Sequence, residues 1–375
     1  MPGVLQTAKL WLPTYLRQRP EPLPTGIKDV MICVCDHYEP LHHADKAEAL
    51  KRLARWRDEY PQVNGGFRDF DGVSPRHTYF YPIEQNDPDL LAGLQEVVHA
   101  TRGEVEVHLH HDGDTPRRFC ERMQKGIDEF REKGFLSTDP AGRLRFAFVH
   151  GDWALDNSHP LGRHCGVNNE IAFLRDLGCY ADFTMPSAPD WTQTRTVNRI
   201  YYAMDCKGPK SHDFGVEARV LSSGPRAQDD GGNRFGDLLM VQGPLGLNWK
   251  WRKHGILPRL ENADLTGANP PTALRMDLWT KLHIHVVGQP EWVFIKLHTH
   301  GAPPPNCDVF LGDPYRRFHE HLAEQYGPDR SWRLHYVTAR EMVNIIHAAE
   351  DGHRGNAGMF RDYRFKRAAE APARS

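Results

Sequence analysis

The chain is constrained most by a regular alternation of short apolar segments with amphipathic segments, which continues from about residue 30 to about residue 346. The apolar segments are rich in strand formers, whereas the segments between them follow helical spacing. Strands that alternate with helices predict a parallel sheet or barrel covered by helices. The predicted strands are Val30–Cys35, Thr78–Tyr81, Glu104–His111, Phe146–Val149, Tyr180–Thr184, Leu238–Gln242, Trp292–His298 and Leu334–Val337. Seven or eight strands suit a closed or nearly closed barrel.

The same pattern predicts the helices and the limits of the domain. Helices are expected at Ala47–Tyr60, Leu90–Ala100, Arg117–Lys133 and Asn168–Leu177, and after the capping box Thr338–Glu341. One domain is therefore expected over residues 28–350, with a loop insertion near residues 205–235. An N-terminal helix and a proline-rich lead-in (residues 1–27) precede it, and a polar tail (residues 351–375) follows.

The composition excludes several classes of protein. The chain has 47 basic and 49 acidic residues among 375, so no basic excess exists to bind nucleic acid. No apolar run approaches the roughly 20 residues of a transmembrane span, and no signal peptide is recognisable. Apolar residues over residues 4–16 follow helical spacing, and this apolar stripe suits contact with a membrane surface or with the domain itself. Seven cysteines without a CxxC pair are typical of a protein of the reducing cytoplasm.

Polar side chains follow four of the predicted strands. Because the carboxyl ends of the strands carry the active site in β/α barrels, these residues are expected to converge on one cavity. The four segments are Asp36–Glu39, His108–Asp114, His150–Trp153 and His298–His300.

The second of these segments predicts a metal site. His108 and His110 lie two residues apart on a strand, so that both imidazoles project from one face and can reach one divalent ion. Asp112 or Asp114 is expected to supply an oxygen ligand, and Asp36 or His37 to complete the set. Imidazole and carboxylate ligands suit zinc most, with iron, nickel or cobalt as alternatives.

The other strand ends offer catalytic and substrate-binding side chains. His298 is a candidate general acid or a residue that orients a ligand, because imidazole exchanges protons near neutral pH. Aromatic and polar groups together suit a carbohydrate. The residues expected to line its pocket are Glu39, His150, Asp152, Trp153, Asn157 and His300.

These motifs and their order resemble the NodB-homology polysaccharide deacetylases, carbohydrate esterase family four, over roughly residues 28–350. The resemblance implies a distorted (β/α)7-type barrel in which Asp36 is the catalytic base and His298 the general acid. His37 stands where that family has a metal-binding aspartate. His110 matches the first histidine of the family's metal motif and Asp114 replaces the second, while His108 and Asp112 form an alternative register.

The resemblance implies a metal-dependent hydrolase that removes acetyl groups from a carbohydrate. Two alternatives remain open. A glycoside hydrolase on the related barrel would need two carboxyl groups, for which Asp36, Glu39 and Asp152 are candidates. A non-catalytic carbohydrate-binding relative would keep the fold without turnover.

Overall fold

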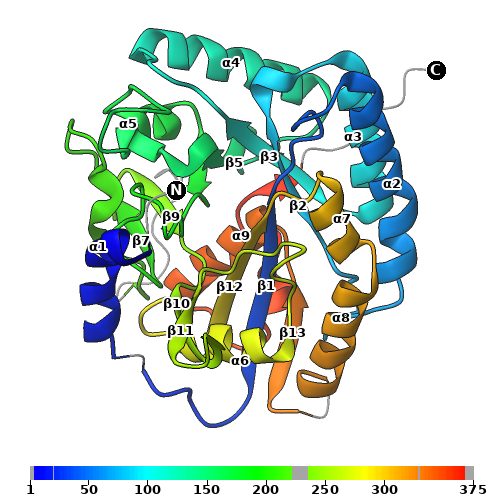
Figure 1. Cartoon of the computed structure of the whole chain (residues 1–375), viewed down its shortest axis with the longest axis vertical. Coiled ribbons are helices and arrows are strands. Elements are labelled where there is room, and N and C mark those ends of the chain that lie inside the picture. The colour runs from blue at the N-terminus through cyan, green and yellow to red at the C-terminus, as the bar shows by residue number, and fades with distance from the viewer. Residues whose placement is uncertain (1–3, 20, 222–234, 328–329, 368–375) are drawn as a thin grey trace.

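The protein is an α/β structure built on a large, mostly parallel sheet (Figure 1). The computed structural model describes residues 4–19, 21–221, 235–327 and 330–367. The strands are β1 (Lys28–His37), β2 (Thr78–Pro82), β3 (Glu104–Leu109), β4 (Ser137–Thr138), β5 (Leu144–His150), β6 (Cys179–Asp182), β7 (Ile200–Ala203), β8 (Gly215–Glu217), β9 (Leu238–Val241), β10 (Gly246–Lys253), β11 (Leu257–Glu261), β12 (Trp292–Thr299), β13 (Trp332–Tyr336) and β14 (Lys366–Arg367).

The sheet follows the order β12-β1-β2-β3-β5-β6-β9-β7-β8, and β13 pairs with β1 beside β2. All pairings from β12 to β9 are parallel, and β7 and β8 add an antiparallel edge. Within the described residues no strand pairing joins β12 to β8, so the sheet itself is not closed. β10 and β11 form a separate hairpin.

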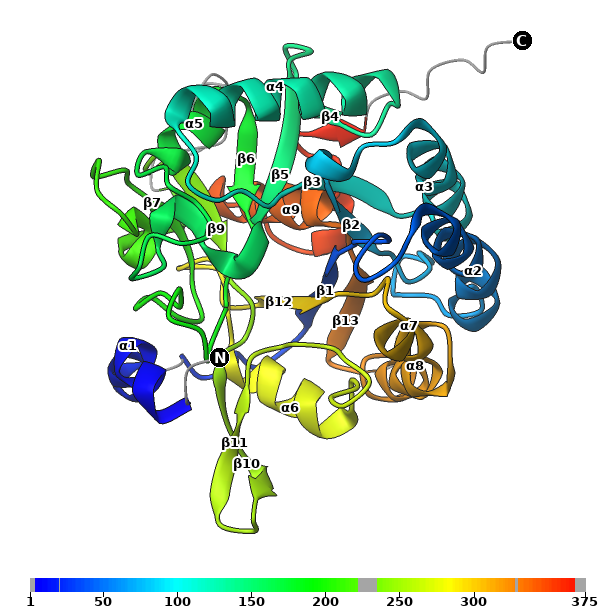
Figure 2. The ribbon, with the colours of Figure 1, turned by 45° about the horizontal axis from the view of Figure 1, so that its top comes forward.

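Helices surround this sheet. They are α1 (Val4–Arg17), α2 (Lys46–Asn64), α3 (Pro88–Thr101), α4 (Pro116–Glu132), α5 (Glu170–Asp176), α6 (Ala273–Leu282), α7 (Pro304–Phe310), α8 (Asp313–Gln325) and α9 (Ala339–Glu350). Figure 2 shows α9 near the centre of the molecule, with α2, α3, α4, α6 and α8 around the outside. None of the described helices is both long and apolar enough to span a membrane.

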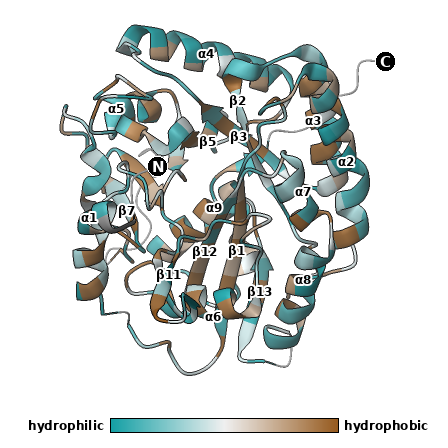
Figure 3. Ribbon diagram, viewed as in Figure 1, coloured by the Kyte–Doolittle hydropathy of each residue, from teal (hydrophilic) through white to brown (hydrophobic). Residues whose placement is uncertain are grey.

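The sheet therefore has two different faces. The outer face packs against α2, α3, α4, α7 and α8 in the larger core, whereas the inner face packs against α9. On β1, Val30, Ile32 and Val34 belong to the outer core, and Cys33 and Cys35 to the inner one. In Figure 3 the central strands β1 and β12 are mostly hydrophobic, while the visible side of α4 is largely hydrophilic.

Helix α9 is buried along its whole length, so its polar side chains need internal partners. Arg340 forms a two-pronged ion pair with Glu104 of β3, and Asn344 donates to two backbone carbonyls. The predicted capping box at Thr338 and Glu341 begins the helix. Buried ion pairs and caps thus fix α9 against the amino ends of the strands.

The described structure agrees with the predicted strands, each of which coincides with an observed one, and with the predicted N-terminal helix, and it differs at the C-terminal end. The stripe on α1 contacts the domain through Trp11, which is 1% exposed. Residues 351–367 are not a free tail: Phe365 is buried and β14 pairs with β4. The short strand β8 lies within the predicted loop insertion, of which residues 222–234 are outside the described residues, as are residues 368–375 of the tail.

Candidate metal centre

Strand β1 delivers two side chains to the inner face of the sheet. The alternation that places Cys33 and Cys35 inside also places His37 inside, and it continues past the strand to Glu39. Both side chains are almost fully buried. Nε2 of His37 has no hydrogen-bond partner among the described residues. Burial, together with the imidazoles of His300 and His108, lowers the pKa of His37 well below its usual value. The neutral ring offers a lone pair.

Strand β3 supplies the second pair, His108 and His110. Nδ1 of His108 lies 2.7 Å from the carbonyl oxygen of Val149 and therefore donates to it, which leaves the lone pair on Nε2. That Nε2 faces Oε1 of Glu39 at 3.3 Å. The Nε2 of His110 lies 3.6 Å from the same oxygen, while its Nδ1 lies 2.7 Å from Glu84.

Strand β12 supplies the third pair, His298 and His300. The ring of His300 lies 4.7 Å from that of His37, and its Nε2 lies 3.8 Å from Oε1 of Glu39. His298 lies deeper, with its ring 6.3 Å from that of His37 and its buried Nδ1 without a hydrogen-bond partner. Burial, followed by Lys296, lowers the pKa of His298 well below its usual value.

The ends of β1 and β3 form what we call the inner cluster: His37, Glu39 and His108, whose ligand atoms all lie within 4.8 Å of one another. His110, His298 and His300 surround it. Burial raises the pKa of Glu39, but His108 and the other imidazoles outweigh that effect and lower it to about 2. A carboxylate and two imidazole lone pairs aimed at one point suit a divalent cation.

The loop after β5 contributes Trp153 to the edge of this cluster. The Trp153 ring lies 6.3 Å from that of His300, edge to face, and its buried Nε1 finds no hydrogen-bond partner in the part of the chain that the structure describes. Asp152 and Trp153 both adopt positive φ angles, 52° and 54°, which are rare for residues other than glycine and often mark functional sites. Asp152 is exposed and lies 3.3 Å from His164.

Asp36 does not face the inner cluster. As the neighbour of His37 on one strand, it projects to the opposite face of the sheet. Its carboxylate is completely buried there, where it accepts a hydrogen bond from the backbone N–H of Gly301 at 2.6 Å and lies 2.8 Å from Nε2 of His77. The position predicted for the base therefore belongs to a buried pair that supports the His300 loop.

Asp112 and Asp114 also lie apart from the inner cluster. Asp112 is exposed and accepts a hydrogen bond from the backbone N–H of His164 at 2.6 Å. Asp114 is buried and turns toward Arg122 and His111. Both aspartates follow the strand in a loop that folds outward, so neither predicted ligand register is complete at the inner cluster.

His150, expected to bind substrate, belongs to a second group that we call the outer cluster: His111, His150, Cys165 and Glu170. All four side chains are buried. The sequence reasoning missed His111, Cys165 and Glu170, because Cys165 and Glu170 come from a loop and from α5 rather than from a strand end. Asn157, also expected at the substrate pocket, instead hydrogen-bonds to Asn168.

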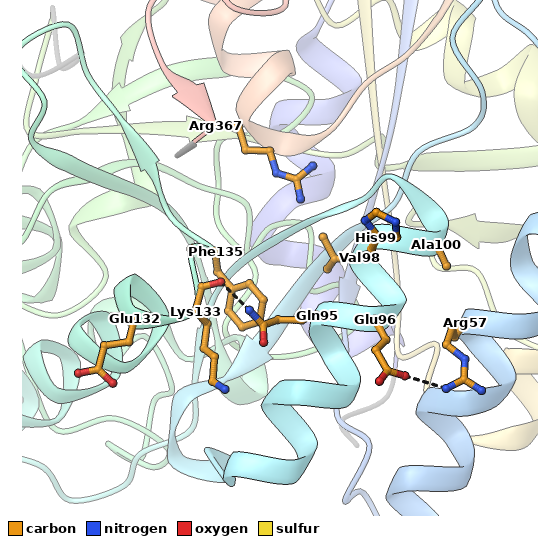
Figure 4. A pocket seen from close by; sticks show the side chains of 11 residues that line it. Arg57, Gln95, Glu96, Val98, His99, Ala100, Glu132, Lys133, Phe135 and Arg367 are labelled. Atoms are coloured by element: carbon orange, nitrogen blue, oxygen red, sulfur yellow. Dashed lines mark hydrogen bonds and ion pairs between the residues drawn. The ribbon is translucent and has the colours of Figure 1, made fainter. Parts of the chain in front are cut away.

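A separate hollow lies on the surface between α3, the end of α4 and β14 (Figure 4). Arg57 at its rim pairs with Glu96 at 2.7 Å, and Gln95 donates to the carbonyl oxygen of Lys133 at 2.9 Å. None of the predicted site residues lines this hollow. The chemistry expected from the sequence is therefore centred on the inner cluster.

No protein family matches the chain, and no curated protein matches it either.

Proposed function

We propose that the inner cluster binds one divalent metal ion through His37, Glu39 and His108, and that the protein is a hydrolase of the polysaccharide-deacetylase type. The carrying observation is the pair of acceptors at 3.3 Å, His108 Nε2 and Glu39 Oε1. Two acceptors that face each other in a buried place need a cation or a proton between them. The orphaned His37 Nε2 supports the cation.

The donor set narrows the choice of metal. Two nitrogens and one carboxylate, with no thiol in the inner cluster, suit zinc first and iron, nickel or cobalt next. Three protein ligands are also the number found in catalytic zinc sites, which keep a position for water or substrate.

The fold supports the same proposal. We propose that the parallel sheet is a distorted barrel of the NodB type, with α9 in its interior at the amino ends of the strands. Gly243, beyond β9, approaches β12, since a Cβ on it would meet the carbonyl oxygen of Lys296 at 2.5 Å. The end of β9 thus comes close to β12 without strand pairing, and the inner cluster lies at the carboxyl ends of the strands, where β/α barrels carry active sites.

His37, Glu39 and His108 would hold the metal ion, which would supply a Lewis acid for the acyl carbonyl and for a water molecule. His110 and His300 are each about one-third exposed and flank Glu39, so they are placed to accept the proton of the attacking water. His298 remains the proposed donor to the leaving group. Asp36 has no part in proton transfer here, because its carboxylate lies on the other face of the sheet.

We propose a carbohydrate substrate because of Trp153. Its ring stands beside His300 at the edge of the cluster, and an indole ring offers the flat apolar surface on which sugars stack. The buried Nε1 without a partner leaves one donor for a substrate hydroxyl.

The test combines metal analysis with acetate release from acetylated oligosaccharides, using the purified full chain. His37→Ala with His108→Ala should remove one equivalent of metal and abolish release. His285→Ala is the matched control, because His285 also belongs to a His-x-His pair but its Nδ1 donates to the carbonyl oxygen of His283. Unchanged metal content in the double variant would contradict the proposal.

The same assay separates the alternatives. New reducing ends instead of acetate would favour a glycoside hydrolase. The position of Asp36 argues against a glycoside hydrolase, because Asp36 lies on the other face of the sheet and Glu39 is the one carboxylate of the inner cluster. Sugar binding with bound metal and no turnover would favour a non-catalytic carbohydrate-binding protein.

A further inference from the structure

The outer cluster brings two imidazole nitrogens and a carboxylate oxygen into a small triangle. Nε2 of His111 lies 2.8 Å from Nε2 of His150 and 3.0 Å from Oε1 of Glu170, and His150 Nε2 lies 3.3 Å from that same oxygen. Cys165 completes the group, with its Sγ 3.5 Å from the other carboxylate oxygen of Glu170. The four side chains could therefore bind one metal ion without large movements.

The Nδ1 contacts of the two rings bear on which nitrogens carry lone pairs. Nδ1 of His150 lies 2.5 Å from the carbonyl oxygen of Gly151 and therefore donates to it. Nδ1 of His111 lies 3.4 Å from the carboxylate of Asp114. With its proton held on Nδ1, His150 presents the lone pair of Nε2 to His111 and Glu170. Nδ1 of His111 makes no hydrogen bond within the described residues, so its proton can stand on Nδ1, beside Asp114, when Nε2 binds a metal ion.

The distances match a tetrahedral zinc site. Zinc bonds of about 2.0–2.1 Å to nitrogen and oxygen place neighbouring ligand atoms about 3.3 Å apart, and a bond of about 2.3 Å to sulfur places sulfur about 3.5 Å from oxygen. The observed separations among the two nitrogens and Oε1 of Glu170 are 2.8–3.3 Å. Sγ of Cys165 lies 3.5 Å from Oε2 of the same carboxylate, and the ligand atoms of all four residues lie within 4.8 Å of one another.

Charge also balances. A glutamate and a cysteine thiolate carry two negative charges, which one Zn²⁺ neutralises, and a buried site requires such compensation. The thiol proton of Cys165 leaves to solvent on binding, because the thiolate is the metal ligand. We propose that the outer cluster is a second metal site, a closed structural zinc centre with the ligands His111, His150, Cys165 and Glu170.

Its position indicates what it does. His150 ends β5, His111 follows β3, and Glu170 begins α5, so the ion would join two strands of the sheet to the helix that covers them. The loop between His150 and Glu170, which carries Trp153, would then be held at both ends. Four protein ligands and complete burial leave no position for substrate.

The experiment measures zinc in the His37→Ala/His108→Ala protein, which lacks the ligands of the inner cluster. One equivalent should remain, and X-ray absorption should show one sulfur at about 2.3 Å with nitrogen and oxygen at about 2.0–2.1 Å. This readout does not depend on activity, so it stands or falls separately from the proposed hydrolase.

Cys165→Ser in that background should remove the sulfur signal and weaken zinc binding at least tenfold. Cys179→Ser is the matched control, because Cys179 is equally buried and also donates to the carbonyl two residues ahead. A folded double variant without zinc, or zinc retained with no sulfur signal, would overturn the proposal. If the double variant does not fold, cobalt-loaded wild-type protein should bind two equivalents and show a thiolate charge-transfer band that Cys165→Ser abolishes; a missing band would refute the site.

Discussion

Replacing Asp36 with alanine tests whether this carboxylate is structural, as its surroundings indicate, or the catalytic base expected from the sequence. The carboxylate is fully buried and holds two partners, the backbone N–H of Gly301 and the imidazole of His77. Trp56 donates to the carbonyl oxygen of Gly301 at 3.3 Å, so the same turn is fixed from both sides. The substitution leaves both donors without an acceptor.

The expected loss is large. Hydrogen bonds to a charged group contribute about 1.5–3 kcal/mol each, and breaking a buried pair by removing one partner costs about 3–5 kcal/mol. We therefore expect Asp36→Ala to lower the free energy of unfolding by about 3–5 kcal/mol. With an unfolding entropy near 2.1 cal/mol/K per residue, a chain of 375 residues has about 0.8 kcal/mol/K, so Tm should fall by about 4–6 °C.

Thermal unfolding followed by circular dichroism measures the effect. Asp112→Ala is the matched control: it also accepts one backbone N–H at 2.6 Å but is exposed, so it should cost less than about 1 kcal/mol. The double variant Asp36→Ala/His77→Ala should lose about 1–3 kcal/mol less free energy of unfolding than the sum of the losses in the two single variants. An Asp36→Ala protein that keeps wild-type stability and loses only turnover would refute the reasoning and restore Asp36 as the base.

Two further predictions concern buried charges far from the clusters. Burial lowers the pKa of His335, but hydrogen bonds to Asp29 and Asp71 outweigh it and raise the pKa above its usual value of about 6.5. The stabilisation by His335 is thus complete below about pH 6.5 and disappears as the pH rises through the raised pKa. Urea titrations should therefore show that His335→Gln lowers the free energy of unfolding more at pH 6 than at pH 9. Equal losses at the two pH values would contradict this prediction. In the same assay, Arg340→Ala should lower the free energy of unfolding by about 3–5 kcal/mol, because it leaves the buried carboxylate of Glu104 without its ion pair. Arg340→Lys should restore part of that free energy, because lysine cannot form the two-pronged pair. Full restoration would show that the two-pronged geometry does not contribute to stability.

The alternation of strands and helices made most of the sheet predictable. Strands buried on both faces appear as short apolar runs bounded by turns, and each of those runs became a strand. The antiparallel additions were harder to predict. β10 and β11 form a hairpin of mixed polar residues with a register shift, and β8 has three half-buried or exposed residues, so neither shows the pattern of a buried strand.

The candidate site was predictable in its location and only partly in its residues. Alternation at the strand ends places residues that are two positions apart on the same face of the sheet. It accounts for three pairs: His37 with Glu39, His108 with His110, and His298 with His300. Alternation also separates Asp36 from His37, although the family resemblance paired their roles. The outer cluster was not predictable, because its cysteine and glutamate reach it through a loop and a helix whose placement depends on tertiary packing.

The two clusters lie on opposite faces of one sheet, yet the chain connects them within a few residues. His110 and His111 are consecutive, but the first flanks Glu39 inside and the second meets His150 outside. On the neighbouring strand, His150 belongs to the outer cluster while Gly151 packs so tightly on His110 that a Cβ there would lie 2.4 Å from its ring. Two residues later, Trp153 reaches His300. Metal binding at the outer cluster, as proposed, would therefore restrain His110 and Trp153, because the chain joins them to His111 and His150 within three residues.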